Sequence, residues 1–255
     1  CSHAVYGKTH RRRKPVLVVD ELEWILHRYQ PDMLWFADDV FTINHGWLGE
    51  FAAEMDRRGI RIPFECISRA DRINARVADL LAGLGCFRIW IGSESGSQRV
   101  LDAMQRGVTV EQIQTAVDLC KSRGIQAGMF LMWGYEGEDL SDIEATVRHV
   151  RQTQPDTFLT TVAYPIGGTP YFEDVADRVL APASWAQSSD RDIRIAGRRS
   201  RRFYANADQL LKAEVELEKL SRSSLPAGPL QLAEIHRRIE MAREGMRTTF
   251  AETEA

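Results

Sequence analysis

The chain has 255 residues, of which 44% are apolar and 27% are charged, and its formal net charge at pH 7 is −3. This length allows one barrel-sized domain with an appendage. The slightly negative charge gives no general attraction to nucleic acid or to an anionic membrane, so we do not expect nucleic acid as a partner. No apolar run approaches the roughly 20 residues that a membrane-spanning helix needs.

The four cysteines stand at positions 1, 66, 86 and 120, and no two of them form a C-x-x-C pair. This spacing is not that of a disulfide framework, and a chain of this length does not need one. Cys66, Cys86 and Cys120 lie in apolar surroundings, where a free thiol behaves as a small buried side chain. We therefore predict a cytoplasmic protein whose thiols stay reduced.

The predicted elements begin with a helix over residues 16–29, preceded by Pro15, a residue that favours the first turn of a helix. Short apolar runs, each a predicted strand, then alternate with helical patterns. The runs are residues 33–37, 62–67, 87–92, 126–133 and 158–163. Two of the intervening helices are predicted to start with capping boxes, Thr109 with Gln112 and Ser141 with Glu144.

Strands that alternate with helices predict parallel pairing with right-handed crossovers. The helix over 16–29 should follow a strand, and that strand would precede residue 1. The sequence therefore predicts an α/β fold, a partial (βα)6 TIM-like barrel that lacks its first strand and carries a C-terminal α-helical extension. A doubly wound open sheet is the alternative.

Polar residues follow the end of every predicted strand, where ligands bind in parallel α/β folds. They are Asp38-Asp39, Ser68-Arg69, Ser93 to Ser97 with Glu94 among them, Gly134 to Glu138, and Tyr164 to Pro170. A single polar loop carries little information. Five such loops with carboxylates, hydroxyls and glycines at one edge predict one site for a polar, extended ligand.

Structural roles compete with this interpretation. Asp38 or Asp39 would cap the next helix, the commonest role of Asp at such a junction. Glu94 would pair with a nearby arginine, and Gly134 would only turn the chain. The six histidines show no metal-ligand spacing, and we expect His149, on a helix, to be solvated.

Four phrases in a fixed order carry a resemblance to a known family. They are C-S-H-A-V-Y-G-K at residues 1–8, F-A-D-D-V-F-T at 36–42, I-G-S-E-S-G-S at 91–97 and G-Y-E-G-E at 134–138. Together they resemble the radical S-adenosylmethionine (SAM) superfamily, in particular its cobalamin-associated branch of anaerobic porphyrin cyclases and carbon methyltransferases. The match implies a radical SAM core over 1–178, truncated at its N-terminus, and an extension over 179–255.

The resemblance also implies cofactors and their ligands. A C-x3-C-x2-C loop would hold a 4Fe–4S cluster, with Cys1 as its third cysteine and the other two before residue 1. SAM would bind the open iron and the strand ends. The implied contacts are Asp38 and Asp39 with the methionine ammonium, Ser68 and Arg69 with its carboxylate, Glu94 with the ribose hydroxyls, and Gly134 with the adenine.

The implied reaction is reductive cleavage of SAM to a 5′-deoxyadenosyl radical that abstracts hydrogen from a small-molecule substrate. An electron donor such as flavodoxin or ferredoxin would reduce the cluster. In the cobalamin branch a methyl group would then reach an unactivated carbon. An oxidative cyclase or rearranging enzyme without methyl transfer is the alternative. Because two thiolates are absent, we expect the chain by itself to be inactive, which iron–sulfide reconstitution with spectroscopy would test.

The last part of the chain has a different pattern. Residues 190–202 are strongly basic, which indicates either a solvated loop or a clamp for an anionic group. Residues 206–223 and 230–247 are predicted as two amphipathic helices, joined through the Pro- and Gly-containing segment 226–229. A rival hypothesis starts from Cys1, since mature bacterial lipoproteins begin on cysteine: the chain would be an N-terminally lipidated ligand-binding lipoprotein.

Overall fold

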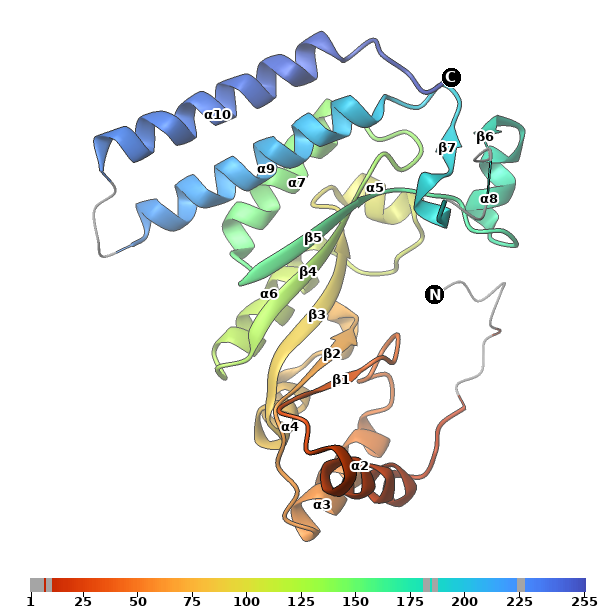
Figure 1. The fold of residues 1–255 in the computed structure, drawn as a ribbon, viewed down its shortest axis with the longest axis vertical. Helices are drawn as coiled ribbons and strands as arrows, with labels where there is room; N and C mark the ends of the chain where they lie inside the picture. Colours follow the sequence, from red (N-terminus) through yellow and green to blue (C-terminus); the bar gives the residue numbers. More distant parts are fainter. Residues whose placement is uncertain (1–6, 8–10, 181–183, 185–187, 224–227) are drawn as a thin grey trace.

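The computed structural model describes residues 7, 11–180, 184, 188–223 and 228–255 (Figure 1). Cys1, the predicted cluster ligand, lies outside the described residues. Within the described residues, no helix is long and apolar enough to cross a membrane.

Within the described part of the chain, one parallel sheet has five strands in the order β1-β2-β3-β4-β5. The strands are β1 (Leu34–Phe36), β2 (Phe64–Ser68), β3 (Cys86–Glu94), β4 (Gln126–Trp133) and β5 (Thr157–Val162). Each coincides with one of the predicted apolar runs to within a few residues. The pairing puts Trp35 beside Glu65, and Trp90 beside Gly128. The prediction of alternating strands and helices is confirmed.

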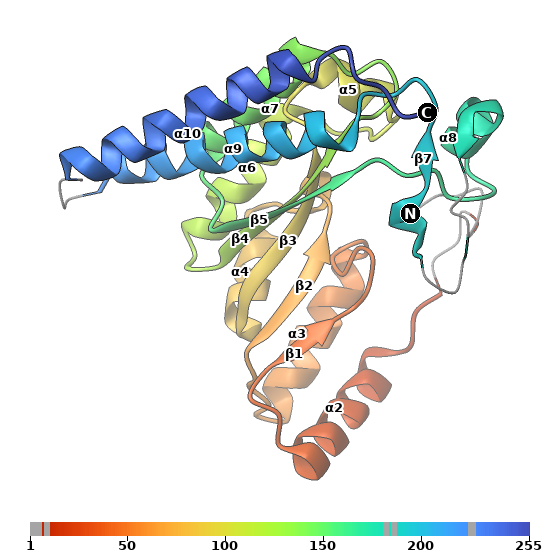
Figure 2. The same cartoon turned by 45° about the horizontal axis from the view of Figure 1, so that its top comes forward.

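Helices cover the outer face of the curved sheet, one ahead of the first described strand and the others after the strands (Figures 1 and 2). They are α2 (Pro15–Tyr29), α3 (His45–Arg57), α4 (Ala75–Leu84), α5 (Gln98–Ala103), α6 (Val110–Lys121) and α7 (Leu140–Thr153). A doubly wound sheet reverses its strand order at one point and carries helices on both faces. The strictly sequential order found here instead gives a partial TIM-like barrel, so the predicted fold class is confirmed.

The structure confirms the capping box predicted for α6 and corrects the one predicted for α7. Thr109 and Gln112 form the predicted capping box of α6. The predicted box of Ser141 with Glu144 is wrong: Asp139 caps α7, and its partner is Asp142. The helix starts earlier than predicted, because the Asp139 carboxylate accepts hydrogen bonds from the backbone N–H groups of Ser141 and Asp142.

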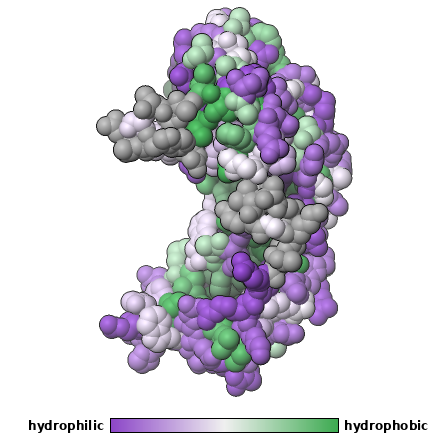
Figure 3. Space-filling model, turned by 90° about the vertical axis from the view of Figure 1, so that its right-hand side faces the viewer, coloured by the Kyte–Doolittle hydropathy of each residue, from purple (hydrophilic) through white to green (hydrophobic). Residues whose placement is uncertain are grey.

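The two faces of the sheet differ because side chains alternate along each strand. Residues such as Cys66 and Met129 join the core beneath the helices, and the described cysteines at 66, 86 and 120 are all buried, as predicted. Trp90, on the opposite and concave face, stacks between Trp35 and Phe130. Figure 3 views the molecule from this side, where the surface is hollowed between its upper and lower parts.

The extension continues from β5 through α8 (Pro170–Val175), the short antiparallel pair β6 (Val179–Leu180) and β7 (Arg194–Ile195), then α9 (Arg201–Ser221) and α10 (Pro229–Thr248). The two predicted helices are present as a hairpin, and α9 starts five residues earlier than predicted. Helix α9 packs between α7 and α10 (Figure 1).

The basic stretch 190–202 is neither wholly solvated nor a free clamp. Two of its arginines pair with carboxylates near the C-terminus: Arg198 with Glu254 at 2.8 Å, and Arg202 with Glu252 at 3.0 Å. The side chain of Arg198 is 8% exposed, so this pair is buried. The stretch thus fastens the C-terminal residues to the start of α9. Whether a domain boundary lies at 178 stays a prediction.

Candidate functional site

The acidic pair after β1 lies in an exposed turn at the carboxyl edge of the sheet. Neither Asp38 nor Asp39 caps α3, because Asn44 is the cap and accepts a hydrogen bond from the backbone N–H of Trp47. The capping alternative for this pair is therefore wrong, and both residues are exposed at the edge where a ligand is expected. Arg12 steadies the turn by donating to the Val40 carbonyl at 3.1 Å.

The next strand end positions Ser68 and Arg69. The Ser68 side chain is buried and shares a hydrogen bond of 2.5 Å with Thr42. Arg69 donates to the carboxylate of Asp71 and to the backbone carbonyl of Arg106, both at 2.8 Å. In this structure both side chains brace neighbouring loops, so their predicted contact with a ligand carboxylate stays a prediction.

Glu94 occupies the end of β3 in a left-handed backbone conformation with φ 59°. This conformation is costly for a residue with a side chain and is concentrated at functional sites. Its carboxylate is 15% exposed and pairs with Arg106 at 3.0 Å. Burial raises the pKa of Glu94 against the opposing effect of Arg106. A buried carboxylate with a raised pKa at a strand end is a candidate ligand group.

Arg106 was missed by the sequence analysis. Its guanidinium lies over Gly92: a Cβ atom there would stand 2.9 Å from Arg106 Nη2 and 3.0 Å from Glu94 Oε1. The Nε of Arg106 is buried with no hydrogen-bond partner among the described residues. The missing side chain at Gly92 was the available signal, because glycine in a strand often marks a close approach.

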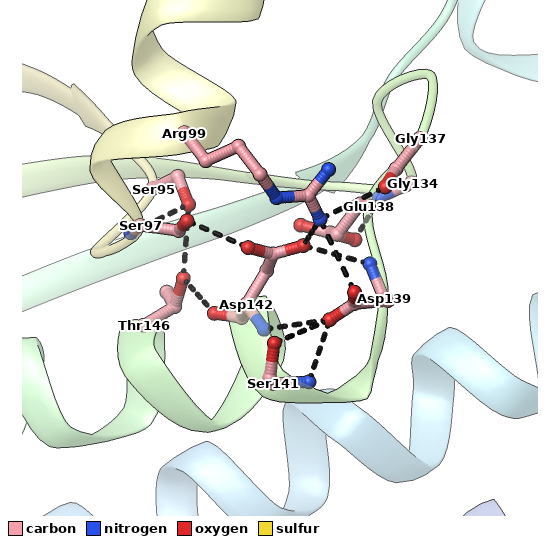
Figure 4. A network of polar contacts seen from close by, with 10 residues as sticks. All are labelled: Ser95, Ser97, Arg99, Gly134, Gly137, Glu138, Asp139, Ser141, Asp142 and Thr146. Atoms are coloured by element: carbon pink, nitrogen blue, oxygen red, sulfur yellow. Dashed lines mark hydrogen bonds and ion pairs between the residues drawn. The ribbon is translucent and has the colours of Figure 1, made fainter.

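A polar network joins the loop after β3 to α7 (Figure 4). Ser97 donates to Asp142 at 2.6 Å, and the backbone N–H of Gly96 donates to Thr146 at 2.9 Å. Asp142 is 3% exposed and also accepts from Arg99 and from the backbone N–H of Asp139. The network holds the loop that carries Glu94 in register with the loop after β4, so these two strand ends form one rigid unit.

The loop after β4 is held in shape by the side chain of Glu138, which belongs to the same loop. The backbone N–H of Gly134 donates to Glu138 at 2.6 Å, and Gly134 has φ 73° (Figure 4). Burial raises the pKa of Glu138 to about 8. Its Oε1 is buried with no hydrogen-bond partner among the described residues. Gly134 therefore does turn the chain. The buried carboxyl group of Glu138 supports that turn, a role that the sequence did not predict.

The expectation that His149 is solvated is wrong. It is 3% exposed on α7, with Nε2 3.4 Å from Ser93 Oγ and Nδ1 3.2 Å from Thr153 Oγ1. Helix α7 packs against α6 and α9, and His149 itself faces Ser93 on β3, which the sequence of the helix does not reveal. Burial lowers the pKa of His149 to about 4.

The buried His149 predicts a loss of stability in acid. The pKa of His149 in the folded protein lies below its unfolded value of about 6.5. The contribution of neutral His149 to the free energy of unfolding is therefore complete above pH 6.5, and it disappears as the pH falls toward 4. We expect the free energy of unfolding of the wild type to fall by about 3 kcal/mol more than that of His149→Gln over this interval. Urea unfolding at several pH values measures this, and parallel pH profiles would contradict it.

The site residues suit SAM, a methionine zwitterion joined to a nucleoside. The strand ends offer exposed carboxylates at Asp38 and Asp39 and a backbone turn at Gly134. They also offer the buried carboxylate of Glu94, beside a buried Arg106 nitrogen that has no hydrogen-bond partner in the part of the chain that the structure describes. A cluster site is a different matter: among the described residues, no group of three or more His, Cys, Asp or Glu side chains could hold a metal ion.

The fold is a partial α/β barrel, and its polar candidate residues gather at the carboxyl edge of the parallel sheet, where ligands bind in folds of this class. The family model described as the radical SAM superfamily matches residues 1–150, more than half of the chain. The chain therefore belongs to the radical SAM superfamily, as the four sequence phrases predicted. Members of this family bind SAM and a 4Fe–4S cluster.

Two curated relatives illustrate the range of activities in the family. An uncharacterized methyltransferase of Pyrococcus horikoshii is 29% identical over 195 residues, 75% of this chain and 42% of that protein. The anaerobic magnesium-protoporphyrin IX monomethyl ester cyclase of Rubrivivax gelatinosus is 26% identical over 181 residues, 70% of this chain and 33% of that protein. The chain thus spans less than half the length of these relatives.

The solved structures support the fold. The radical SAM methyltransferase TsrM of Kitasatospora setae, with tryptophan and a SAM analogue bound, matches with a TM-score of 0.66 at 17% identity, over 97% of this chain and 60% of that one. The coproporphyrinogen III oxidase of Escherichia coli, a radical SAM enzyme, matches with a TM-score of 0.54 at 15% identity, over 93% and 47%. Both agree with a partial TIM-like barrel.

Proposed function

We propose that this chain is the carboxyl-terminal part of a cobalamin-dependent radical SAM methyltransferase that acts on an unactivated carbon of a small molecule. The buried, strained Glu94 paired with Arg106 at the carboxyl edge is the observation that carries the SAM site. The likeness to a methyltransferase of Pyrococcus horikoshii and to the fold of TsrM supports the choice of methyl transfer.

Each polar group has a role that its chemistry suits. The Glu94 carboxylate accepts hydrogen bonds from the two ribose hydroxyls, since ionised acceptors make the stronger bonds. Asp38 and Asp39 attract the methionine ammonium from an exposed turn. Arg69 and Arg106, whose loops are joined by a hydrogen bond of 2.8 Å, offer two cations for the methionine carboxylate.

The remaining contacts concern the nucleoside and water. The turn at Gly134 is assigned to the adenine, because its backbone stands at the carboxyl end of β4. The concave face below Glu94, with Trp90 and Phe130 stacked at 5.0 Å, provides an apolar wall that keeps water away from a reactive intermediate. When bound, the 4Fe–4S cluster supplies the electron that cleaves SAM, and we propose Cys1 as one of its ligands.

The products formed from SAM test the proposal. The full-length protein, reconstituted anaerobically with iron, sulfide and cobalamin, would be reduced and mixed with SAM and a substrate extract, and its nucleosides measured by mass spectrometry. Methyl transfer to carbon yields both 5′-deoxyadenosine and S-adenosylhomocysteine. Formation of 5′-deoxyadenosine alone would favour the cyclase alternative, which the relative from Rubrivivax gelatinosus supports. Formation of neither would contradict the SAM site.

A further inference from the structure

Helix α9 of the extension reaches the loop that follows β4. It is fixed to the barrel by a hydrogen bond of 2.6 Å from Thr160 on β5 to Asp208, and by an ion pair of 3.1 Å between Arg151 on α7 and Glu214. These contacts fix the middle of α9 to β5 and α7. The helix, including its first turn ahead of these contacts, lies beyond residue 150, where the match to the family model stops.

Tyr204, in that first turn, packs directly on Gly134. The tyrosine is 4% exposed, and a Cβ atom on Gly134 would lie 2.7 Å from its Cζ and 2.9 Å from its hydroxyl oxygen. The glycine is thus required twice, once by its φ of 73° and once by the ring above it. On its other side, the Gly134 N–H is held by Glu138 at 2.6 Å.

The residues from 134 to 138 are consequently fixed between the barrel and the extension. Glu138 supplies a hydrogen bond from within the loop, whereas Tyr204 supplies an aromatic ring from a different part of the chain. Gly134 and Gly137 make the backbone of this turn easy to displace, so we expect both contacts to be needed to fix the position of Gly134. Removal of the ring would leave a cavity above Gly134 into which the turn can move.

We propose that Tyr204 is a positioning residue for SAM: by packing on Gly134 it holds the turn that receives the nucleoside. This inference rests on the proposed function, and it assigns to the extension a part in cofactor binding. The ring carries the effect, since ring carbons approach Gly134 as closely as the hydroxyl oxygen does. Phenylalanine at this position should therefore substitute for tyrosine.

Calorimetric titration of SAM into the full-length reconstituted protein tests this. We expect Tyr204→Ala to weaken SAM binding about tenfold, the effect of one well-packed aromatic contact. Tyr204→Phe should retain the wild-type affinity. Val215→Ala is the matched control, because Val215 is equally buried on α9, at 4% exposure, but three turns further along the helix. Equal affinities of the alanine variants at 204 and 215 would overturn the inference.

A double-mutant cycle isolates the contact itself. Gly134→Ala creates a clash and a strained φ in the wild type, but only the strained φ in the Tyr204→Ala background. The loss of affinity caused by Gly134→Ala should therefore be smaller in that background. Identical losses in the two backgrounds would show that the ring does not act through Gly134.

Hydrogen exchange separates this inference from the proposed function. Tyr204→Ala should accelerate exchange of the Gly134 amide by about tenfold while Val215→Ala leaves it unchanged. If the wild type does not bind SAM, the proposed function fails, and the exchange rates still decide whether Tyr204 holds the turn. Unchanged exchange in Tyr204→Ala would refute the positioning role.

Discussion

Replacement of Glu94 by alanine is expected to lower the affinity for SAM about a hundredfold. Two hydrogen bonds from ribose hydroxyls to a buried carboxylate would be lost, each contributing about 1.5 kcal/mol. Glu94→Gln keeps the size and one acceptor oxygen, so its loss should be about tenfold. Calorimetric titration of SAM measures both. Glu234→Gln is the control, because Glu234, on α10, pairs with Arg237 in a solvent-exposed ion pair.

The backbone of Glu94 gives a second, independent test. Glu94→Gly and Glu94→Ala both lack the carboxylate and leave Arg106 without its partner. Only glycine adopts φ 59° without strain, so Glu94→Gly should be about 1 kcal/mol more stable than Glu94→Ala in urea unfolding. Both should bind SAM equally poorly. If the glycine variant bound like the wild type, the carboxylate would have no role in binding.

Gly96→Ala is expected to destabilise the fold by about 3 kcal/mol. A Cβ atom at this position would lie 2.5 Å from the Cβ of His149, 2.6 Å from the Ala145 carbonyl oxygen and 2.7 Å from the Cα of Thr146. Two of these atoms belong to the backbone of α7 and cannot move aside. The loop that carries Glu94 would be pushed off the helix, so affinity for SAM should fall together with stability.

Gly83→Ala, also a glycine-to-alanine substitution, is expected to stabilise the fold, in contrast to Gly96→Ala. Gly83 lies on the exposed side of α4, and no neighbouring atom would come within 4 Å of an added Cβ. Alanine should stabilise this helix by about 0.5–1 kcal/mol. Urea unfolding of the two variants measures the contrast. Similar unfolding midpoints for both would contradict the close packing of Gly96 on α7.

The candidate site was predictable only in part. Polar residues at strand ends could be found because parallel strands deliver their carboxyl ends to one edge, so Asp38, Glu94 and Gly134 stood out from their positions alone. Arg106 and Tyr204 could not be found in this way. They follow no strand, and they reach the edge only because α5 and α9 are packed where they are.

The order of strands and helices and the glycine turns were determined by the sequence itself, because hydrophobic periodicity and backbone preference act over a few neighbouring residues. The family entered through the resemblance of four ordered phrases, which the family model bears out. The environment of each polar group was decided by the tertiary structure. His149 has the sequence context of a surface helix yet is buried at 3% exposure, and Arg198 and Arg202 pair with carboxylates about 50 residues away. Burial and ion pairing depend on which distant segments meet, and local sequence does not encode that.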